Sequence, residues 1–341
     1  MLYIFRMRIL VVRFSALGDV VLVTPLFQKI KARYPKCHLD FLTDMKFQSL
    51  FSNDPHIDSI IPYNIAEETP ANLLRLIGKI RGRNYDYIID VHLIPRSLLI
   101  LFLGKAIVRR RINKYTRQRR RMVASCKQEK IPHVVDRYLE TINGKNSNRY
   151  RPKIYFEEWE IEEIRKGMNG IKDSRKIVGF SPGASKKTKI WEIDKLRKLA
   201  QSLIFDHELF IIFLGNKNEI PLIAEISKAL DSRFLNLAGK TDPRQLALYL
   251  HACDVLFTTD SGPMHIAVAA GTPVVAVFGP TVEAFGFSPY DERSVVISKQ
   301  LPCRPCSLHG RDSCPLGHHN CLKLIDVNEV KDMILGCLKV V

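Results

Sequence analysis

Short apolar segments alternate with longer amphipathic segments along the chain. The apolar segments predict buried strands. The amphipathic segments predict helices, because their apolar positions recur with the spacing of one helix face. The predicted strands are residues 8–12, 38–43, 59–63, 85–91, 176–181, 208–214, 254–259 and 274–278, and the predicted helices are residues 20–33, 70–83, 192–205, 218–230, 262–270 and 326–338. This alternation is typical of an α/β fold with parallel sheets.

The pattern occurs twice, on either side of a charged segment at residues 157–176. A chain of 341 residues is long for one hydrophobic core and sufficient for two. We therefore predict two Rossmann-like domains facing across a central cleft, at residues 1–165 and 166–325, followed by a C-terminal helix at 326–341. Ligands of such sheets bind beyond the carboxyl ends of the strands. The loops to search for chemistry follow Val12, Phe180, Leu214, Thr259 and Phe278.

The chain carries a large excess of positive charge. Lys and Arg number 52 against 35 Asp and Glu, which gives a formal net charge of +17. Such an excess favours a polyanionic partner: a nucleic acid, an anionic membrane surface or a phosphorylated substrate. Eight basic residues and no acidic one lie between Arg109 and Arg121, and a solvated loop is the alternative interpretation of this run. No apolar run reaches the roughly 18 residues that a membrane span needs. The N-terminus is expected to form the first strand, with Met7 as an alternative start, and not a secretory signal.

The loop after the first predicted strand is R-F-S-A-L-G-D, at residues 13–19. Asp19 stands near the start of the following helix, where an aspartate caps a helix well. The other interpretation makes Asp19 a general base at the carboxyl end of the strand. The loop contains no G-x-G-x-x-G, so a dinucleotide-binding fingerprint is absent. This absence argues against a nucleotide-sugar epimerase or dehydrogenase.

Two later loops have the composition of anion sites. F-S-P-G-A-S-K-K-T-K-I-W, at residues 180–191, joins small residues, among them Ser185, to three lysines including Lys189, which can supply charge to a phosphate. A solvated basic turn is the alternative. T-T-D-S-G-P-M-H, at residues 258–265, places Ser261 as a candidate cap before a helix whose N-terminus would attract a diphosphate. The loop F-G-P-T, at residues 278–281, adds only a weak signal of the same kind.

Four segments together resemble glycosyltransferase family 9, the bacterial heptosyltransferases. They are R-F-S-A-L-G-D-V-V-L-V-T-P, S-P-G-A-S-x-x-T-K-x-W, D-S-G-P-M-H-I-A-V-A-A-G-T-P and F-G-P-T, and they follow one another in the order expected over nearly the whole chain. The resemblance implies the GT-B fold, with two Rossmann-like domains. It also implies inverting transfer without a catalytic metal, so we expect no cofactor.

The resemblance assigns roles to single residues. Asp19 matches the proposed catalytic base, and Lys189 matches a lysine that neutralises the phosphates of the donor. Glu219 matches a glutamate that contacts the nucleotide ribose, with a solvated acid at a helix start as the alternative. The donor-binding segment is matched by Asp260, Ser261, Gly262, Pro263, Met264 and His265. Within that segment Asp260 would lie close to the sugar hydroxyls, and Gly262 and His265 close to the diphosphate.

The implied substrates fit the charge. The donor is ADP-heptose and the acceptor a lipid A anchor bearing phosphates and Kdo carboxylates, so the run from Arg109 to Arg121 would bind these anions and the anionic leaflet. The implied enzyme is cytoplasmic, with peripheral contact at the inner membrane. Another nucleotide sugar or acceptor stays open. A nucleic-acid-binding protein is the alternative of another class, but the basic run lies in one predicted loop and no nucleic-acid module is recognisable.

The C-terminal part of the chain contains the cysteine pattern C-x2-C-x7-C-x6-C. Its members are Cys303, Cys306, Cys314 and Cys321, with His309, His318 and His319 between them. Four such residues can hold a tetrahedral zinc. Reduced thiols packed in a loop are the alternative, since eight cysteines without a signal sequence suit a reducing compartment. We expect no catalytic role for this pattern.

Overall fold

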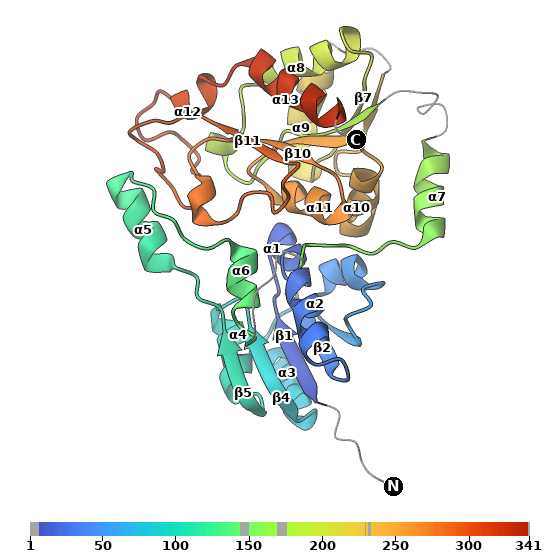
Figure 1. The fold of residues 1–341 in the computed structure, drawn as a ribbon, viewed down its shortest axis with the longest axis vertical. Coiled ribbons are helices and arrows are strands. Elements are labelled where there is room, and N and C mark those ends of the chain that lie inside the picture. Colours follow the sequence, from blue (N-terminus) through green and yellow to red (C-terminus); the bar gives the residue numbers. More distant parts are fainter. Residues whose placement is uncertain (1–6, 144–149, 169–175, 229, 231–232, 340–341) are drawn as a thin grey trace. The chain divides into compact units, whose positions relative to one another are not determined.

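The computed structural model describes residues 7–143, 150–168, 176–228, 230 and 233–339. The chain divides into two compact units. The first contains Met1–Lys114 and Val134–Tyr155, and the second contains Tyr115–His133 and Phe156–Val341. Each unit is built on one parallel sheet (Figure 1).

The first unit has a five-stranded sheet in the order β3-β2-β1-β4-β5. Its strands are β1 (Arg8–Val12), β2 (His38–Asp44), β3 (Ser59–Tyr63), β4 (Tyr85–Asp90) and β5 (Ala106–Arg111). Its helices are α1 (Leu17–Val21), α2 (Thr24–Arg33), the 3-10 helix η1 (Met45–Phe51), α3 (Pro70–Gly82), α4 (Pro95–Leu103) and α6 (Val134–Leu139). The strand order changes direction between β1 and β4, so the loops after these two strands mark the expected ligand site.

The second unit has a six-stranded sheet in the order β11-β10-β9-β6-β7-β8. Its strands are β6 (Ile177–Ser181), β7 (Phe210–Phe213), β8 (Phe234–Asn236), β9 (Val255–Thr259), β10 (Val274–Phe278) and β11 (Val295–Ser298). Its helices are α5 (Thr116–Ser125), α7 (Glu158–Gly167), η2 (Lys187–Lys189), α8 (Ile193–Phe205), η3 (Lys217–Glu219), α9 (Ile220–Ser227), α10 (Pro243–His251), α11 (Gly262–Ala270), η4 (Glu283–Phe285), α12 (Asn320–Lys323) and α13 (Val327–Lys339). This is the order of a full Rossmann-like sheet, with its change of direction between β6 and β9.

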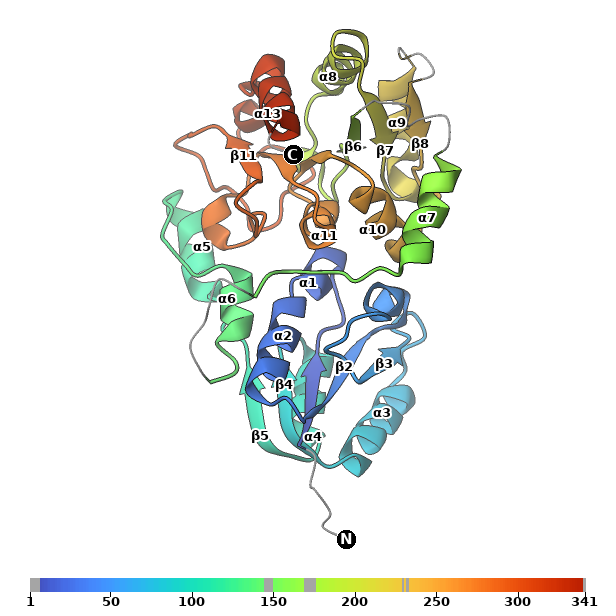
Figure 2. The same ribbon diagram turned by 45° about the vertical axis from the view of Figure 1, so that its right-hand side comes forward.

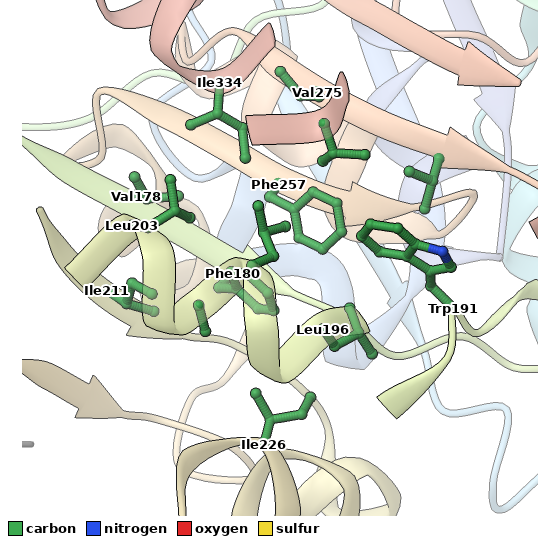
Figure 3. Close-up of a cluster of buried hydrophobic side chains, with 14 of the residues drawn as sticks. Val178, Phe180, Trp191, Leu196, Leu203, Ile211, Ile226, Phe257, Val275 and Ile334 are labelled. Carbon is green, nitrogen blue, oxygen red and sulfur yellow. The ribbon is translucent and has the colours of Figure 1, made fainter. Parts of the chain in front are cut away.

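The core of the second unit is continuous from the sheet into the helices that cover it (Figure 3). Phe180 of β6 and Phe257 of β9 lie with their ring centres 4.7 Å apart. Trp191 is fully buried beside them and donates its indole N–H to the carbonyl oxygen of Leu322, at 3.2 Å. The loop that carries Lys189 is therefore attached to the core two residues later in the chain.

Two predicted helices are wrong in their continuity. The helix predicted over residues 20–33 is two helices, α1 and α2, with a break at Leu22 and Val23. Pro25 lies in the first turn of α2, where its missing N–H leaves no bond unmade, whereas inside a longer helix it would remove one. The helix predicted over residues 218–230 likewise begins as η3 and continues as α9, with Pro221 in the first turn of α9.

The basic run from Arg109 to Arg121 is not one loop of the N-terminal domain. Arg109, Arg110 and Arg111 end strand β5 in the first unit, whereas the later arginines lie on α5 in the second unit. Met122 of α5 is fully buried in a small cluster with Val282 and Phe285. Apolar packing of α5 against the segment after β10 therefore separates the two halves of the run.

No helix among the described residues is both long and apolar enough to cross a membrane.

A buried ion pair attaches the connecting segment to the second unit. Arg244 of α10 donates through Nε to Glu160 of α7 at 2.8 Å and through Nη2 at 2.5 Å. The Arg244 guanidinium also lies over the ring of Phe156, 4.9 Å from its centre. Figure 2 shows α7 beside α10. A charge-assisted fork of this kind holds α7 against α10 in one geometry.

We expect Glu160→Gln to lower the melting temperature of the protein, because Arg244 would stay buried without its counter-charge, at a cost of about 3 kcal/mol. The double variant Glu160→Met/Arg244→Met is expected to be less destabilised than the single one, since no charge is then buried. Thermal unfolding followed by circular dichroism measures both. A double variant that melts below Glu160→Gln would contradict the explanation.

Candidate functional site

In the first unit, Arg13 joins the loops after β1 and β4. Its Nη1 donates to the carbonyl oxygen of Val91 at 2.7 Å, and its Nη2 lies 2.5 Å from Oδ2 of Asp19. Burial opposes the charge on Arg13, but Asp19, Tyr138 and Asp90 together outweigh burial and the pKa of Arg13 is raised. The Asp19 side chain keeps 25% of its surface exposed. The arrangement holds a carboxylate at the edge of the sheet with access to solvent.

Asp19 does not cap the helix. The N-cap of α1 is Ala16, and Asp19 lies inside the first turn with its carboxylate on Arg13. The capping interpretation of Asp19 is therefore wrong. Arg13 was not singled out from the sequence, although its place directly after a strand was a usable signal.

The other titratable groups at this edge are poor candidates for a base. Burial, with the nearby cations of Arg13 and Lys114, lowers the pKa of His92 to about 3. Its Nδ1 accepts a hydrogen bond from the backbone N–H of Phe14 at 3.3 Å, so the ring proton lies on Nε2.

Asp90 is fully buried, and three hydrogen bonds occupy its carboxylate. They come from the backbone N–H of His92 and Leu93 and from the hydroxyl of Ser97. Burial raises the pKa of Asp90 despite these bonds. The carboxylate of Asp90 therefore stabilises the turn that leads into α4.

In the second unit, three loops meet at Asp260. Oδ2 of Asp260 lies 2.7 Å from Nζ of Lys189 and accepts a hydrogen bond of 2.6 Å from the hydroxyl of Thr281. Lys189 also donates to the backbone carbonyl oxygen of Asp260, at 3.1 Å. Lys189 follows β6, Asp260 follows β9 and Thr281 follows β10. Parallel strands bring these carboxyl ends to one edge, at the change of strand order.

The N-terminus of α11 begins beside this group. Ser261 occupies the N-cap position but makes no capping bond, because its hydroxyl is hydrogen-bonded to that of Thr258 at 3.1 Å. Ser261 therefore stands at the predicted N-cap position, but the predicted capping hydrogen bond is not formed. A helix start without a side-chain cap offers its first N–H groups and its dipole to an anion.

The remaining residues of the donor segment differ in exposure. Gly262 and Pro263 are half-buried, whereas Met264 is fully buried and His265 nearly so. Because the side chain of Met264 is buried, this residue would contact a ligand through its backbone N–H. Ser185 is exposed, on the turn that leads to Lys189.

Glu219 lies against the small residues of two neighbouring loops. A Cβ atom on Gly183 would come within 2.2 Å of its carboxyl group, and one on Gly215 within 2.8 Å. Its Oε2 accepts a hydrogen bond from the backbone N–H of Asn216, at 2.8 Å, as in a capping box. Burial nevertheless raises the pKa of Glu219. Both the helix-start interpretation and the ligand interpretation thus have support in the geometry.

The four clustered cysteines do not form a ready metal site. Among the described residues, no group of three or more His, Cys, Asp or Glu side chains is arranged to hold a metal ion. All four are free thiols, and Sγ of Cys303 lies 3.9 Å from Nε2 of His318. Burial raises the pKa of Cys321 to about 11, so this thiol is protonated near neutral pH.

The chain is similar to known proteins in sequence and in fold. The family model "Glycosyltransferase family 9 (heptosyltransferase)" matches residues 73–314. Lipooligosaccharide heptosyltransferase 2 of Campylobacter jejuni is 28% identical over 331 residues, covering 95% of this chain and 96% of the relative. A glycosyltransferase family 9 structure from Veillonella parvula superposes with a TM-score of 0.83 at 20% identity, covering 98% of each chain.

The structure of E. coli ADP-heptose LPS heptosyltransferase II superposes with a TM-score of 0.78 at 24% identity, covering 98% of this chain and 99% of that one. These structures confirm the predicted α/β fold of the GT-B type with two Rossmann-like domains. The chain belongs to glycosyltransferase family 9, the heptosyltransferase family, and is a glycosyltransferase.

Proposed function

We propose that this enzyme transfers heptose from ADP-heptose to a lipopolysaccharide inner-core acceptor. The observation that carries the proposal is the meeting of Lys189, Asp260 and Thr281 at the N-terminus of α11, in a chain that matches the heptosyltransferase family. A leaving nucleoside diphosphate gains negative charge, and a lysine beside an uncapped helix start is suited to stabilise it.

The donor is proposed to lie along the carboxyl edge of the second sheet. Its diphosphate would bind Lys189 and the first turn of α11, and its sugar hydroxyls would contact Asp260. Glu219 would accept hydrogen bonds from the ribose. The close approach of Glu219 to Gly183 and Gly215 supports this, because the missing side chains let its carboxyl group lie against the loops after β6 and β7, at the edge where the donor is proposed to bind.

Asp19 is proposed as the base of an inverting displacement. It takes the proton of the acceptor hydroxyl while that oxygen attacks the anomeric carbon, and the bond from that carbon to the oxygen of ADP breaks. The bond from Arg13 supports this role, since it holds the carboxylate in one position. The low pKa of His92 and its occupied Nδ1 make the imidazole a weak competitor.

The acceptor is proposed to be lipid-linked, with the enzyme in peripheral contact with an anionic membrane surface. On α4, Leu99, Phe102 and Leu103 are exposed at the spacing of one helix face, and Phe102 is 60% exposed. The next strand, β5, has Ile107 at 79% exposure followed by exposed arginines. Apolar side chains beside positive charge are the composition of an interfacial surface.

We expect Asp19→Asn to lower acceptor-dependent ADP release from ADP-heptose by about 100-fold or more, because the base is lost. The affinity for ADP should stay unchanged, because the proposed donor residues lie on the second sheet. Asp58→Asn is the matched control: its carboxylate is 21% exposed and also pairs with a cation, Lys31. Retention of most of the turnover by Asp19→Asn would exclude Asp19 as the base. ADP binding without transfer by the wild type would point to another sugar or acceptor.

We expect Glu219→Gln to weaken ADP binding about tenfold, through the loss of charged hydrogen bonds to the ribose. The same substitution should stabilise the fold at neutral pH. Because burial raises the pKa of Glu219 in the folded state, the ionised form destabilises the fold above that pKa. The melting temperature of the variant relative to the wild type should therefore be higher at pH 7 than at pH 4.

Calorimetric titration with ADP and thermal unfolding at the two pH values measure these effects. Glu192→Gln, at the start of α8, is the control for a helix-start acid. Unchanged ADP binding by Glu219→Gln would leave Glu219 a capping residue alone.

We expect Leu99→Gln/Phe102→Gln to reduce binding to vesicles containing anionic phospholipid, measured by co-sedimentation, by about tenfold. Arg110→Gln/Arg111→Gln should weaken binding mainly at low salt, because screening already removes that attraction at high salt. Trp159→Gln is the control, because Trp159 on α7 is 63% exposed. If Trp159→Gln abolishes binding and the α4 variant does not, the membrane contact lies elsewhere.

A further inference from the structure

The cysteine-rich segment, residues 303–321, packs against two of the three loops that meet at Asp260. One contact is with the turn that carries Lys189, and the other is with the turn at Pro280 and Thr281. The proposed function gives this segment no task.

Arg304 connects the segment to the turn after β10. It is 3% exposed, and its Nη2 donates to the carbonyl oxygen of Thr281 at 2.7 Å. Its Nη1 donates to the carbonyl oxygen of Lys299, which follows β11. The backbone N–H of Cys306 adds a bond to the carbonyl oxygen of Pro280, at 3.2 Å. The turn is thus held from its backbone side while the hydroxyl of Thr281 holds Asp260.

Burial lowers the pKa of Arg304, because the guanidinium is far from water. Keeping such a group buried is costly unless its hydrogen bonds are made. Arg304 makes those bonds to the carbonyl oxygens of Thr281 and Lys299, and it thereby links the loops after β10 and β11.

A second set of contacts holds the lysine turn. The backbone N–H of Thr188 donates to the carbonyl oxygen of Arg311 at 3.0 Å, and the N–H of Arg311 donates to the hydroxyl of Thr188 at 2.8 Å. Nε2 of His319 is hydrogen-bonded to the carbonyl oxygen of Thr188 at 2.9 Å. The backbone N–H and the carbonyl oxygen of Thr188 are therefore both hydrogen-bonded to the cysteine-rich segment, which fixes the backbone directly before Lys189.

Gly310 is the point of closest approach. Its φ is +85°, and a Cβ atom placed there would lie 2.8 Å from Cβ of Lys186 and 3.1 Å from Cγ of Lys189. Because the first of these atoms is next to the backbone, the lysine turn itself would have to move. Gly317, in the same segment, has a similar φ of +70° with nothing within 4 Å of the equivalent atom.

We propose that the cysteine-rich segment is a positioning element for the donor diphosphate, which sets the places of Lys189 and Thr281 and, through them, of Asp260. This inference rests on the proposed donor site. The segment acts through Arg304, through Gly310 and through the bonds of Arg311 and His319 to Thr188, and none of these needs to touch the donor. A misplacement of about 1 Å can cost about 100-fold in reaction rate, so a segment that sets the places of these groups affects the donor site even where the fold is intact.

The test compares Gly310→Ala with Gly317→Ala, using ADP as the probe in calorimetric titrations. Both variants place a side chain at positive φ, so both carry a similar backbone strain. Only Gly310→Ala presses on the lysine turn. We expect it to weaken ADP binding about tenfold and to raise the KM for the sugar nucleotide without changing the KM for the acceptor. Gly317→Ala should match the wild type in all three.

Arg304→Met provides the second arm, with Arg304→Lys as the conservative variant and Arg293→Met as the control. Arg293 also donates to a backbone carbonyl, that of Gly271, but away from the donor loops. We expect the methionine variant to lose ADP affinity and the lysine variant to recover part of it, with Arg293→Met unchanged.

The outcomes separate the inference from the proposed function. If the wild type binds ADP and Gly310→Ala and Arg304→Met bind it equally well, the segment does not position the donor site. Equal losses in Gly310→Ala and Gly317→Ala also overturn the inference, because strain alone then explains them. If the wild type itself fails to bind ADP, the donor assignment falls and the inference falls with it.

Discussion

One carboxylate oxygen, Oδ2 of Asp260, joins three loops at the carboxyl edge of the second sheet. It accepts from Thr281 and pairs with Lys189, so the loops after β6, β9 and β10 are tied at one atom. The positive charge of Lys189 is therefore balanced by Asp260. A bound diphosphate would compete for the same lysine. Such a charge-assisted pair holds the lysine in one place.

The first unit uses the same principle with a different pair. Arg13 reaches from the end of β1 to the carbonyl oxygen of Val91 and to Asp19. Its guanidinium fixes both contacts in one plane, which a lysine could not do. Each sheet thus presents one oriented carboxylate at its change of strand order. In the first unit it is a candidate base, and in the second it organises the proposed donor site.

The apolar pattern located the inner strands well and the sheet edges poorly. Strands β1, β6, β9 and β10 lie inside their sheets, are nearly all apolar, and were predicted, because a parallel strand covered on both faces is apolar throughout. The strands missed were β5, β8 and β11, which are three of the four sheet edges, whereas β3, the fourth, was predicted. The three arginines of β5 interrupt the apolar pattern that predicts a strand, and an edge strand tolerates such charged residues. The break between α1 and α2 was also missed, although Pro25 was a visible signal.

The sequence by itself determined the fold class, the family and the loops that carry the candidate chemistry. These depend on short-range patterns: apolar spacing, the place of glycine and proline, and motifs that lie within one loop. Only the tertiary structure decided which partners those loops have. It paired Asp19 with Arg13, divided the basic run between two units and set the cysteine-rich segment against the turn of Lys189. Arg13 and Asp19 lie in one loop, but the side-chain conformations that pair them are not recorded in a sequence motif. The other contacts join residues far apart along the chain, and they follow from how the elements pack.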